Sequence, residues 1–359
     1  MIAFFIFLLI LGVLIVVHEL GHFIIAKKLG VRVEKFSLGF GPQIFKRKRR
    51  DTEYSISVVP LGGYVELAGD TLEEYTGKKD EYLAQSPGRR FQIIFFGPLL
   101  NYLLAFLCFW FIFFAGYPTL TSQVGGLVDG FGAKDSGIEV GDRIIAINGR
   151  QIRYWEDIQK VIHAKGATSP VKLTILRGSD KKDISTEVKE KQYDDIIGKK
   201  QKVGILGITP SDEIVKVRHG FIDSFFLGIR KTQDLTVVTY KALWGMITGR
   251  LSLRESVTGP LGMLYITSKV ARLGVIAVLH LIAILSLNLA IFNLLPLPVL
   301  DGGHIFLLGI EKIRGRYFTL KTERAITNVG FAIIISLAVL VTLNDLFRFG
   351  DKILRFFSK

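Results

Sequence analysis

The 359-residue sequence has only one cysteine, Cys108, so no disulfide can form within the chain. It also has no charged side chain before His18, and the stretch from Phe91 to Ala115 has none at all. A secretory signal peptide begins with a basic segment and ends at a cleavage site of small residues, and residues 24–28 (IIAKK) do not supply one. The first apolar stretch is therefore expected to remain on the protein as a membrane segment.

What the sequence has in abundance is long apolar runs. Four of them, Ile2–Ala26, Phe91–Ala115, Val275–Leu300 and Ile326–Leu343, are nearly or wholly free of Asp, Glu, Lys and Arg. About 20 such residues in a helix cross the hydrocarbon core of a bilayer. The sequence predicts a polytopic α-helical membrane protein with about four transmembrane helices.

The distribution of charge predicts the orientation of these helices. The formal charge is +14, and much of it lies in a run at Lys46–Arg50 after the first span and in a group between residues 312 and 324. Basic residues in short loops mark the cytoplasmic side, so the N-terminus and the long segment between the second and third spans are expected outside the cytoplasm. The basic tail after residue 347 would then also lie outside, against that rule. We interpret the basic groups as topology signals and contacts with anionic lipid, with no nucleic-acid partner.

The strongest chemical signal lies inside the first apolar run, where residues 18–22 read His-Glu-Leu-Gly-His. On a helix this spacing places His18 and His22 on one face, where both can bind one Zn²⁺, with Glu19 beside the open position as general base. Ionisable residues are costly in lipid unless they are paired, metallated or face a cavity. The alternative is a satisfied polar patch without a metal.

Catalytic zinc usually has three protein ligands, and Asp301 is the candidate for the third. It follows the third apolar run, after Pro296 and Pro298, which break a helix, and before Gly302-Gly303, which allow a turn. His18 lies about 12 Å along the helix from Ala26, so the predicted topology brings all three ligands to a similar depth near the cytoplasmic face. The alternative is an Asp that caps a helix.

The segment after the second span is predicted to be a small soluble domain, from residue 116 to about 210. The series Ser136-Gly137-Ile138, Gly141-Asp142 and Ile147-Asn148-Gly149, with a helix expected at 155–164 and a strand at 170–177, resembles a PDZ domain. PDZ domains bind an extended peptide at a sheet edge, often by its C-terminal carboxylate. A role as a size filter or spacer remains an open alternative.

Residues 33–67 are rich in strand patterns. Thr52–Val59 is expected to pair with Tyr64–Leu67 through a turn at residues 60–63, and 33–40 with 43–49. The apolar tip predicts a hairpin that dips toward the metal motif, the alternative being an ordinary cytoplasmic hairpin. Phe221–Arg272 is helical and amphipathic, and is expected at the membrane surface as a linker.

Together the His-Glu-Leu-Gly-His motif, Gly97-Pro98-Leu99-Leu100-Asn101 and Leu300-Asp301-Gly302-Gly303 resemble the site-2 protease family, and the inserted domain and hairpin are similar to its bacterial RseP group. The resemblance implies zinc ligands at His18, His22 and Asp301 and a catalytic base at Glu19. It also implies that Asn293 and the hairpin residues Gly62, Gly63 and Tyr64 bind substrate, and that Gly97 and Asn101 pack beside the active-site helix. One PDZ domain stands where many proteobacterial relatives have two.

The expected organisation is a first transmembrane helix (1–30), a cytoplasmic hairpin region (31–90), a second helix (91–115), the PDZ domain (116–210), an amphipathic linker (211–273), a third helix carrying Leu-Asp-Gly-Gly (274–310), a cytoplasmic loop (311–325), a fourth helix (326–346) and a tail (347–359). The expected function is zinc-dependent cleavage of single-span proteins, such as anti-sigma factors or remnant signal peptides, in or near their membrane segment. The expected location is the bacterial inner membrane.

Two other functions fit parts of the sequence. A non-proteolytic PDZ scaffold would not need Glu19. A zinc carrier would need acidic residues along several spans, and the second and fourth spans offer none before Asp345. His280 is expected to pack between helices, and His304 could support the metal site.

Overall fold

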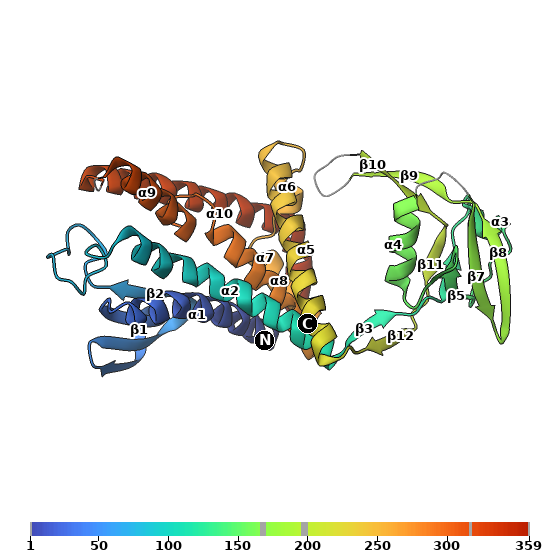
Figure 1. Cartoon of the computed structure of the whole chain (residues 1–359), viewed down its shortest axis with the longest axis horizontal. Coiled ribbons are helices and arrows are strands. Elements are labelled where there is room, and N and C mark those ends of the chain that lie inside the picture. Colours follow the sequence, from blue (N-terminus) through green and yellow to red (C-terminus); the bar gives the residue numbers. More distant parts are fainter. Residues whose placement is uncertain (1, 166–169, 195–199, 316–317, 358–359) are drawn as a thin grey trace. The chain divides into compact units, whose positions relative to one another are not determined.

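The computed structural model describes residues 2–165, 170–194, 200–315 and 318–357. It divides into two compact units (Figure 1). The membrane unit comprises Met1–Ile112, Phe225–Thr239 and Leu253–Lys359, and the second unit comprises Phe113–Ser224 and Tyr240–Ser252.

Four helices in the described part of the chain are long and apolar enough to cross a membrane. They are α1 (Ile2–Lys28), α2 (Pro87–Ala115), α8 (Val275–Asn293) and α10 (Leu320–Phe357). The number of spans agrees with the sequence prediction. The expected tail at 347–359 does not form a separate element, because α10 continues to Phe357.

The third predicted span differs from expectation, since it is two helices and not one. α8 ends at Asn293, and α9 (Asp301–Arg314) begins at the aspartate. The intervening chain turns back against the start of α9 so closely that a Cβ on Gly303 would lie 2.0 Å from the Leu297 carbonyl oxygen. The prolines at 296 and 298 end α8, and the glycines permit the close turn. The loop expected at 311–325 is largely the end of α9 and the start of α10.

The segment 211–273, expected as an amphipathic linker at the membrane surface, also differs from the prediction. It contains α5 (Phe221–Ile247), α6 (Leu253–Ser256) and α7 (Pro260–Ala271), and α7 packs against α1, α8 and α10. The carboxylate of Asp345, which is fully buried, accepts hydrogen bonds from the amides of Gly259 (3.1 Å) and Gly262 (2.7 Å) at the start of α7. Because those amides have no partner within the helix, the carboxylate caps them and ties α7 to α10.

The strand region forms one antiparallel pair, β1 (Val33–Arg49) and β2 (Thr52–Leu67). The expected turn at residues 60–63 is absent, since β2 runs through it, and Tyr64–Leu67 pairs with the start of β1 instead of with Thr52–Val59. Phe36 is paired with both Val65 and Tyr54, so the first part of β1 lies between two parts of β2. β2 packs along α1.

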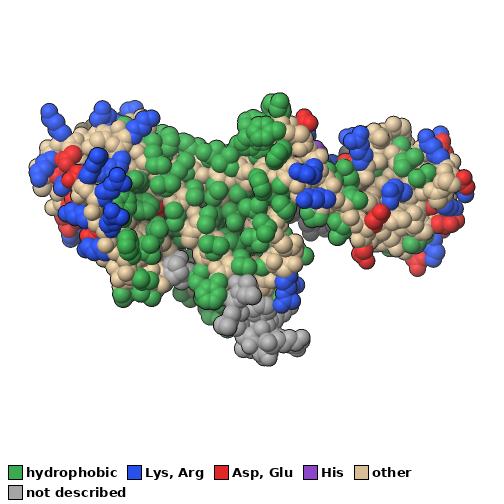
Figure 2. Space-filling model, turned by 90° about the horizontal axis from the view of Figure 1, so that it is seen from below, with side chains coloured by type: hydrophobic (Ala, Val, Ile, Leu, Met, Phe, Trp, Pro, Cys, Tyr) green, Lys and Arg blue, Asp and Glu red, His purple; other side chains and the backbone are tan. Residues whose placement is uncertain are grey.

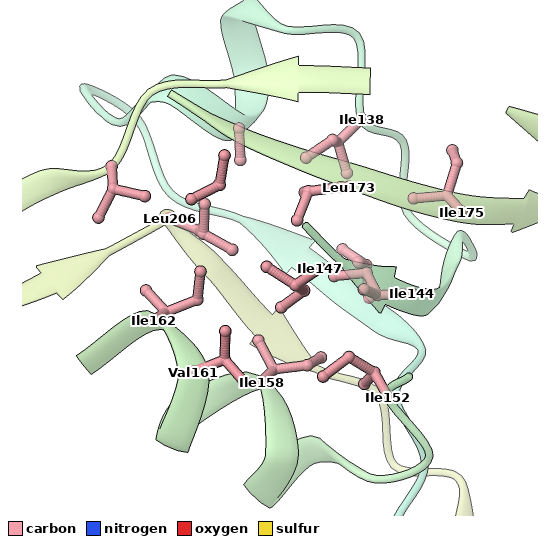
Figure 3. Packing of buried hydrophobic residues seen from close by; sticks show 14 of the residues in the cluster. Ile138, Ile144, Ile147, Ile152, Ile158, Val161, Ile162, Leu173, Ile175 and Leu206 are labelled. Atoms are coloured by element: carbon pink, nitrogen blue, oxygen red, sulfur yellow. The ribbon is translucent and has the colours of Figure 1, made fainter. Parts of the chain in front are cut away.

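In the second unit the strands and helices are β3 (Tyr117–Leu120), β4 (Val124–Leu127), α3 (Gly132–Asp135), β5 (Arg143–Ile147), β6 (Arg150–Gln151), α4 (Trp155–Lys165), β7 (Val171–Arg177), β8 (Asp180–Thr186), β9 (Lys189–Asp194), β10 (Lys200–Ile205), β11 (Ile208–Pro210) and β12 (Ile214–Val217). A four-stranded sheet has the order β6-β5-β7-β8. Figure 3 shows Ile144 and Ile147 of β5 and Leu173 of β7 facing Ile158 and Ile162 of α4, and this cluster forms the core. The helix and strand expected at 155–164 and 170–177 are present.

A paired ribbon leads into and out of this unit, because β3 pairs with β12 along its length. Glu213, just before β12, accepts hydrogen bonds from the Thr121 hydroxyl (2.8 Å) and from Arg143 of β5 (2.8 Å). The hydroxyl and the guanidinium hold the pKa of Glu213 below its ordinary value. The ribbon is thereby fastened to the body of the unit.

Candidate active site

The membrane unit brings together two imidazoles and a carboxylate from α1 and α9. His18 and His22 lie one turn apart, and their Nε2 atoms are 3.3 Å from each other. The Asp301 carboxylate lies 3.1 Å from His18 Nε2 and 3.6 Å from His22 Nε2. All three side chains are shielded, with exposed fractions of 12, 14 and 17%. This is the only group of three or more potential metal ligands found among the described residues.

A second contact fixes the orientation of His22. Its Nδ1 lies 2.9 Å from the carbonyl oxygen of Ile93 in α2. A carbonyl oxygen can only accept, so Nδ1 carries the proton and Nε2 presents its lone pair to the centre of the cluster. Such an outer hydrogen bond is the usual partner of a histidine that binds metal.

Asn101 of α2 contacts Nδ1 of His18, as the Ile93 carbonyl contacts Nδ1 of His22. It is fully buried, its side-chain amide nitrogen lies 3.3 Å from His18 Nδ1, and its Oδ1 has no hydrogen-bond partner among the described residues. An amide offers either an acceptor or a donor, according to which of its two outer atoms faces the ring. Turning the amide over would place its unpartnered oxygen against an Nδ1–H group and leave Nε2 of His18 free for a metal. The Ser286 hydroxyl of α8 donates to the Asn101 backbone carbonyl (2.8 Å), which joins α2 to α8 at this level.

Two glycines allow α1 and α2 to approach at the site. A Cβ on Gly97 would lie 2.3 Å from His22 Nε2, and a Cβ on Gly21 would lie 2.2 Å from the Phe96 carbonyl oxygen. Real Cβ atoms do not come so close to other atoms. Any larger residue at either position would push the helices apart or displace the imidazole.

Glu19 is half-buried and faces β2. A Cβ on Gly63 would be 3.4 Å from Glu19 Cγ, and the backbone of Val65 lies beside the carboxylate. Gly62 and Tyr64, the other two hairpin residues predicted to bind substrate, contact Phe40 instead. Gly62 has a φ of +144° and packs under the ring of Phe40, while Tyr64 stacks on that ring with centroids 6.2 Å apart.

Of the other residues singled out in the sequence, Asn293 lies beside the metal ligands, whereas His304 and His280 lie outside the ligand group. Asn293, the last residue of α8, has its amide nitrogen 3.3 Å from His18 Nε2. His304 lies one turn into α9 and is not part of the ligand group. His280 packs edge-on against Phe109 with ring centroids 5.5 Å apart, as expected of a helix-packing residue. The roles of Ser286 and the Ile93 carbonyl were not predicted, and a backbone carbonyl leaves no signal in a sequence.

The donor set fits a divalent metal. Two neutral imidazole nitrogens and one carboxylate oxygen lie within 4.8 Å of one another. The buried Oδ2 of Asp301 lies beside His18 Nε2 and makes no hydrogen bond to any described residue, and Oδ1 is the oxygen nearer to His22. An unsatisfied, buried carboxylate oxygen beside an imidazole lone pair is stabilised by a cation. Two nitrogens and one oxygen are also a ligand set of catalytic zinc, which keeps its fourth position open.

Sequence comparison gives relatives along nearly the whole chain. A Campylobacter jejuni protein named "Putative zinc metalloprotease Cj1068" is 35% identical over 347 residues, which cover 95% of this chain and 92% of that protein. A Clostridium acetobutylicum protein of similar name, "Putative zinc metalloprotease CA_C1796", is 33% identical, and the match covers 94% of this chain and 95% of that protein. "Zinc metalloprotease RasP" of Geobacillus kaustophilus is 28% identical, and the match covers 96% of this chain and 97% of that protein.

Solved structures match a part of the chain. PDZ domains of SdrC-like proteins from Listeria innocua and Listeria monocytogenes are 19 and 21% identical, with TM-scores of 0.21 and 0.20. Each match covers 26% of this chain, and 96 and 87% of the respective domain.

The family model for peptidase family M50 matches residues 6–337. This match spans most of the chain and includes all the site residues described above, which confirms the resemblance seen in the sequence. The chain belongs to peptidase family M50, the site-2 protease family, and is a membrane-embedded metallopeptidase.

Proposed function

We propose that this protein is a zinc-dependent intramembrane endopeptidase that cuts single-span membrane proteins within or beside their transmembrane segment. The observation that carries the proposal is the convergence of His18, His22 and Asp301, with Glu19 beside them, at α1, a helix apolar enough to cross a membrane. The names of the relatives support zinc as the cofactor.

The proposed chemistry divides among the metal ligands, Glu19 and Asn293. His18, His22 and Asp301 would hold the ion, and a bound Zn²⁺ supplies a Lewis acid that polarises the scissile carbonyl and activates water. The Glu19 carboxylate takes the proton from the attacking water and gives it to the leaving amine. The Asn293 amide, next to His18, can donate a hydrogen bond to the substrate backbone.

A helical substrate hides its carbonyl groups in its own hydrogen bonds, so it must unwind before cleavage. Gly63–Leu67 of β2 pairs with β1 on one side and lies against α1 near Glu19. We propose that the other edge of this segment, with Gly62, Gly63 and Tyr64, pairs with the unwound substrate and replaces its lost hydrogen bonds. Phe40, Ile44, Phe45 and Val58 of the same strand pair expose apolar side chains, which favours entry of the hairpin into the membrane.

The proposed location is the bacterial inner membrane, with the N-terminus and the second unit outside the cytoplasm and the metal site near the cytoplasmic side. The basic residues of β1 and of the α9–α10 connection support this orientation. Anti-sigma factors and remnant signal peptides are the proposed substrate classes.

We propose that the second unit is a PDZ domain that binds an extended peptide. A groove of about 280 Å³ lies between α4 and the β10–β11 region, and it is lined by residues that include Ile158, Ile162 and Leu206. Among the described strands, β11 pairs only with β4, so its other edge is open to an added strand.

Filling this groove should change which substrates are cut. We expect Gln159→Trp, whose side chain would occupy the groove, to slow cleavage of a substrate that keeps its extracytoplasmic domain by several-fold. A truncated substrate without that domain should be cut at the wild-type rate. Lys160→Trp, one position along α4 and outside the groove lining, is the matched control. Equal rates for both substrates in all three proteins would favour a spacer role.

Removal of the metal tests the proposed activity itself. Purified protein in detergent should cleave a single-span substrate, lose that activity after treatment with a chelator, and regain it with Zn²⁺ but not with Ca²⁺, because imidazole ligands select zinc over the oxygen-seeking calcium. Peptide products identified by mass spectrometry would locate the cut. Absence of cleavage in a zinc-loaded protein, even with a truncated substrate, would favour the non-proteolytic scaffold.

A further inference from the structure

A polar pocket lies where the end of α1 meets the connection between β1 and β2. It has a volume of about 240 Å³ and is lined by Phe23, Lys27, Arg49, Arg50, Thr52 and Tyr54. Phe23 and Lys27 come from the last two turns of α1, Arg49 ends β1, Arg50 lies in the turn, and Thr52 and Tyr54 belong to the start of β2. Nothing in the proposed protease mechanism uses this pocket.

The pocket is cationic, and its charges are not neutralised within the protein. Lys27, Arg49 and Arg50 make no ion pair with a carboxylate in the described part of the chain. Neighbouring cations behave differently, since Lys46 pairs with Glu53 (2.8 Å) and Arg32 with Asp80 (3.1 Å). Three cations held around one cavity repel one another unless an anion enters.

The backbone at the turn adds a second indication. Arg50 has a φ of 55°, a left-handed conformation that residues other than glycine rarely adopt. Strain of this kind is commonly kept where it aims a functional side chain. Two arginines at the turn offer planar donor groups of the kind that recognises phosphate.

The position of the pocket indicates what kind of anion it meets. Lys27 lies next to the end of the first candidate span, which finishes at Lys28. Figure 2 shows Lys and Arg side chains gathered at one end of the membrane unit, beside a broad hydrophobic surface. The anions found at this boundary are lipid phosphates.

The face of α1 below the pocket suits an acyl chain. Leu20 and Ile24 precede Lys27 at helical spacing, so the three share one face, and the two apolar side chains are 36 and 45% exposed. Within the pocket Phe23 and Tyr54 pack edge to face at 6.0 Å and form an apolar wall.

We propose that this pocket binds the phosphate group of one anionic phospholipid, with an acyl chain lying along Leu20 and Ile24. The lipid would connect the end of α1 to the β1–β2 turn. In doing so it would fix the depth of the hairpin relative to the helix that carries the His-Glu-Leu-Gly-His motif.

The test is native mass spectrometry of the full-length protein in nonionic detergent, titrated with palmitoyl-oleoyl-phosphatidylglycerol, the matching phosphatidylcholine, or inorganic phosphate. We expect phosphatidylglycerol to bind at least tenfold more tightly than phosphatidylcholine. Arg49→Gln/Arg50→Gln should weaken phosphatidylglycerol binding by about tenfold or more, because each interfacial cation contributes on the order of 1 kcal/mol. Lys27→Gln, a change on the other wall, should act in the same direction.

The matched control is Arg47→Gln/Lys48→Gln, which removes two cations from the same strand but not from the pocket lining. It should change binding by less than about twofold. Equal losses in the two double variants would mean a diffuse surface charge and would overturn the proposal. Inorganic phosphate that binds as tightly as the lipid would instead identify a site for a free anion. Unchanged zinc content and a single size-exclusion peak would show that each variant is folded.

Discussion

Replacing Glu19 with glutamine is expected to abolish cleavage while leaving zinc in place. The two side chains have nearly the same shape, so the packing against Gly63 should persist. An amide cannot take the proton of the attacking water, and loss of a general base typically costs 10²- to 10⁴-fold in rate. We therefore expect a fall of at least about 10³-fold in turnover of a single-span substrate, with zinc measured by inductively coupled plasma mass spectrometry at the wild-type ratio.

Glu34→Gln is the control for this variant. Glu34 lies on β1, is 44% exposed and contacts Arg32 at 3.5 Å, so its change should alter the rate by less than about twofold. Turnover that survives in Glu19→Gln would remove Glu19 as the base. Zinc lost together with activity would mean that the carboxylate supports the metal rather than the proton transfer.

Replacing Asp301 with alanine is expected to cause the largest loss of metal. The carboxylate is the only oxygen donor in the ligand group, and its Oδ2 has no other hydrogen-bond partner among the described residues. Loss of an outer-shell partner commonly weakens metal binding 10- to 100-fold, so loss of a ligand should exceed about 100-fold. The measurement is zinc bound after dialysis against buffers of fixed free zinc.

Asp51→Ala is the control, since Asp51 is exposed at the β1–β2 turn and lies outside the ligand group. It should bind zinc like the wild type. Full zinc occupancy in Asp301→Ala would require a different third ligand, and His304, one turn further along α9, would be the first residue to examine.

The local elements were predictable because they depend on local chemistry. Uncharged runs predicted the four candidate spans, and the spacing of His18 and His22 predicted that both imidazoles share one face of α1. Pro296, Pro298 and Gly302 correctly marked a break, but the sequence did not show that a separate helix would begin at Asp301. The hydrophobic pattern of a segment predicts the secondary structure of that segment, but not the point at which the chain turns into the next element.

Partners distant in the chain were harder to predict. The sequence predicts a hairpin turn at residues 60–63, whereas Tyr64–Leu67 pairs with the start of β1, because a strand pattern specifies neither its neighbour nor its register. The segment containing α7 is predicted at the membrane surface, but it packs among α1, α8 and α10, and the buried Asp345 ties its start to α10. A single carboxylate at the end of an apolar run gives no indication of the amides that it will cap.

The sequence by itself determined the membrane class, the metal-binding residue types and the candidate base. Only the tertiary structure decided how those residues are held: the Ile93 carbonyl and Asn101 that orient the two imidazoles, the glycines that let α1 and α2 meet, and the cationic pocket formed by α1 and the β1–β2 turn. The physical reason is that residue chemistry and helical spacing are properties of a short segment. Close approach, buried hydrogen bonds and uncompensated charge arise only when segments distant in the chain pack together.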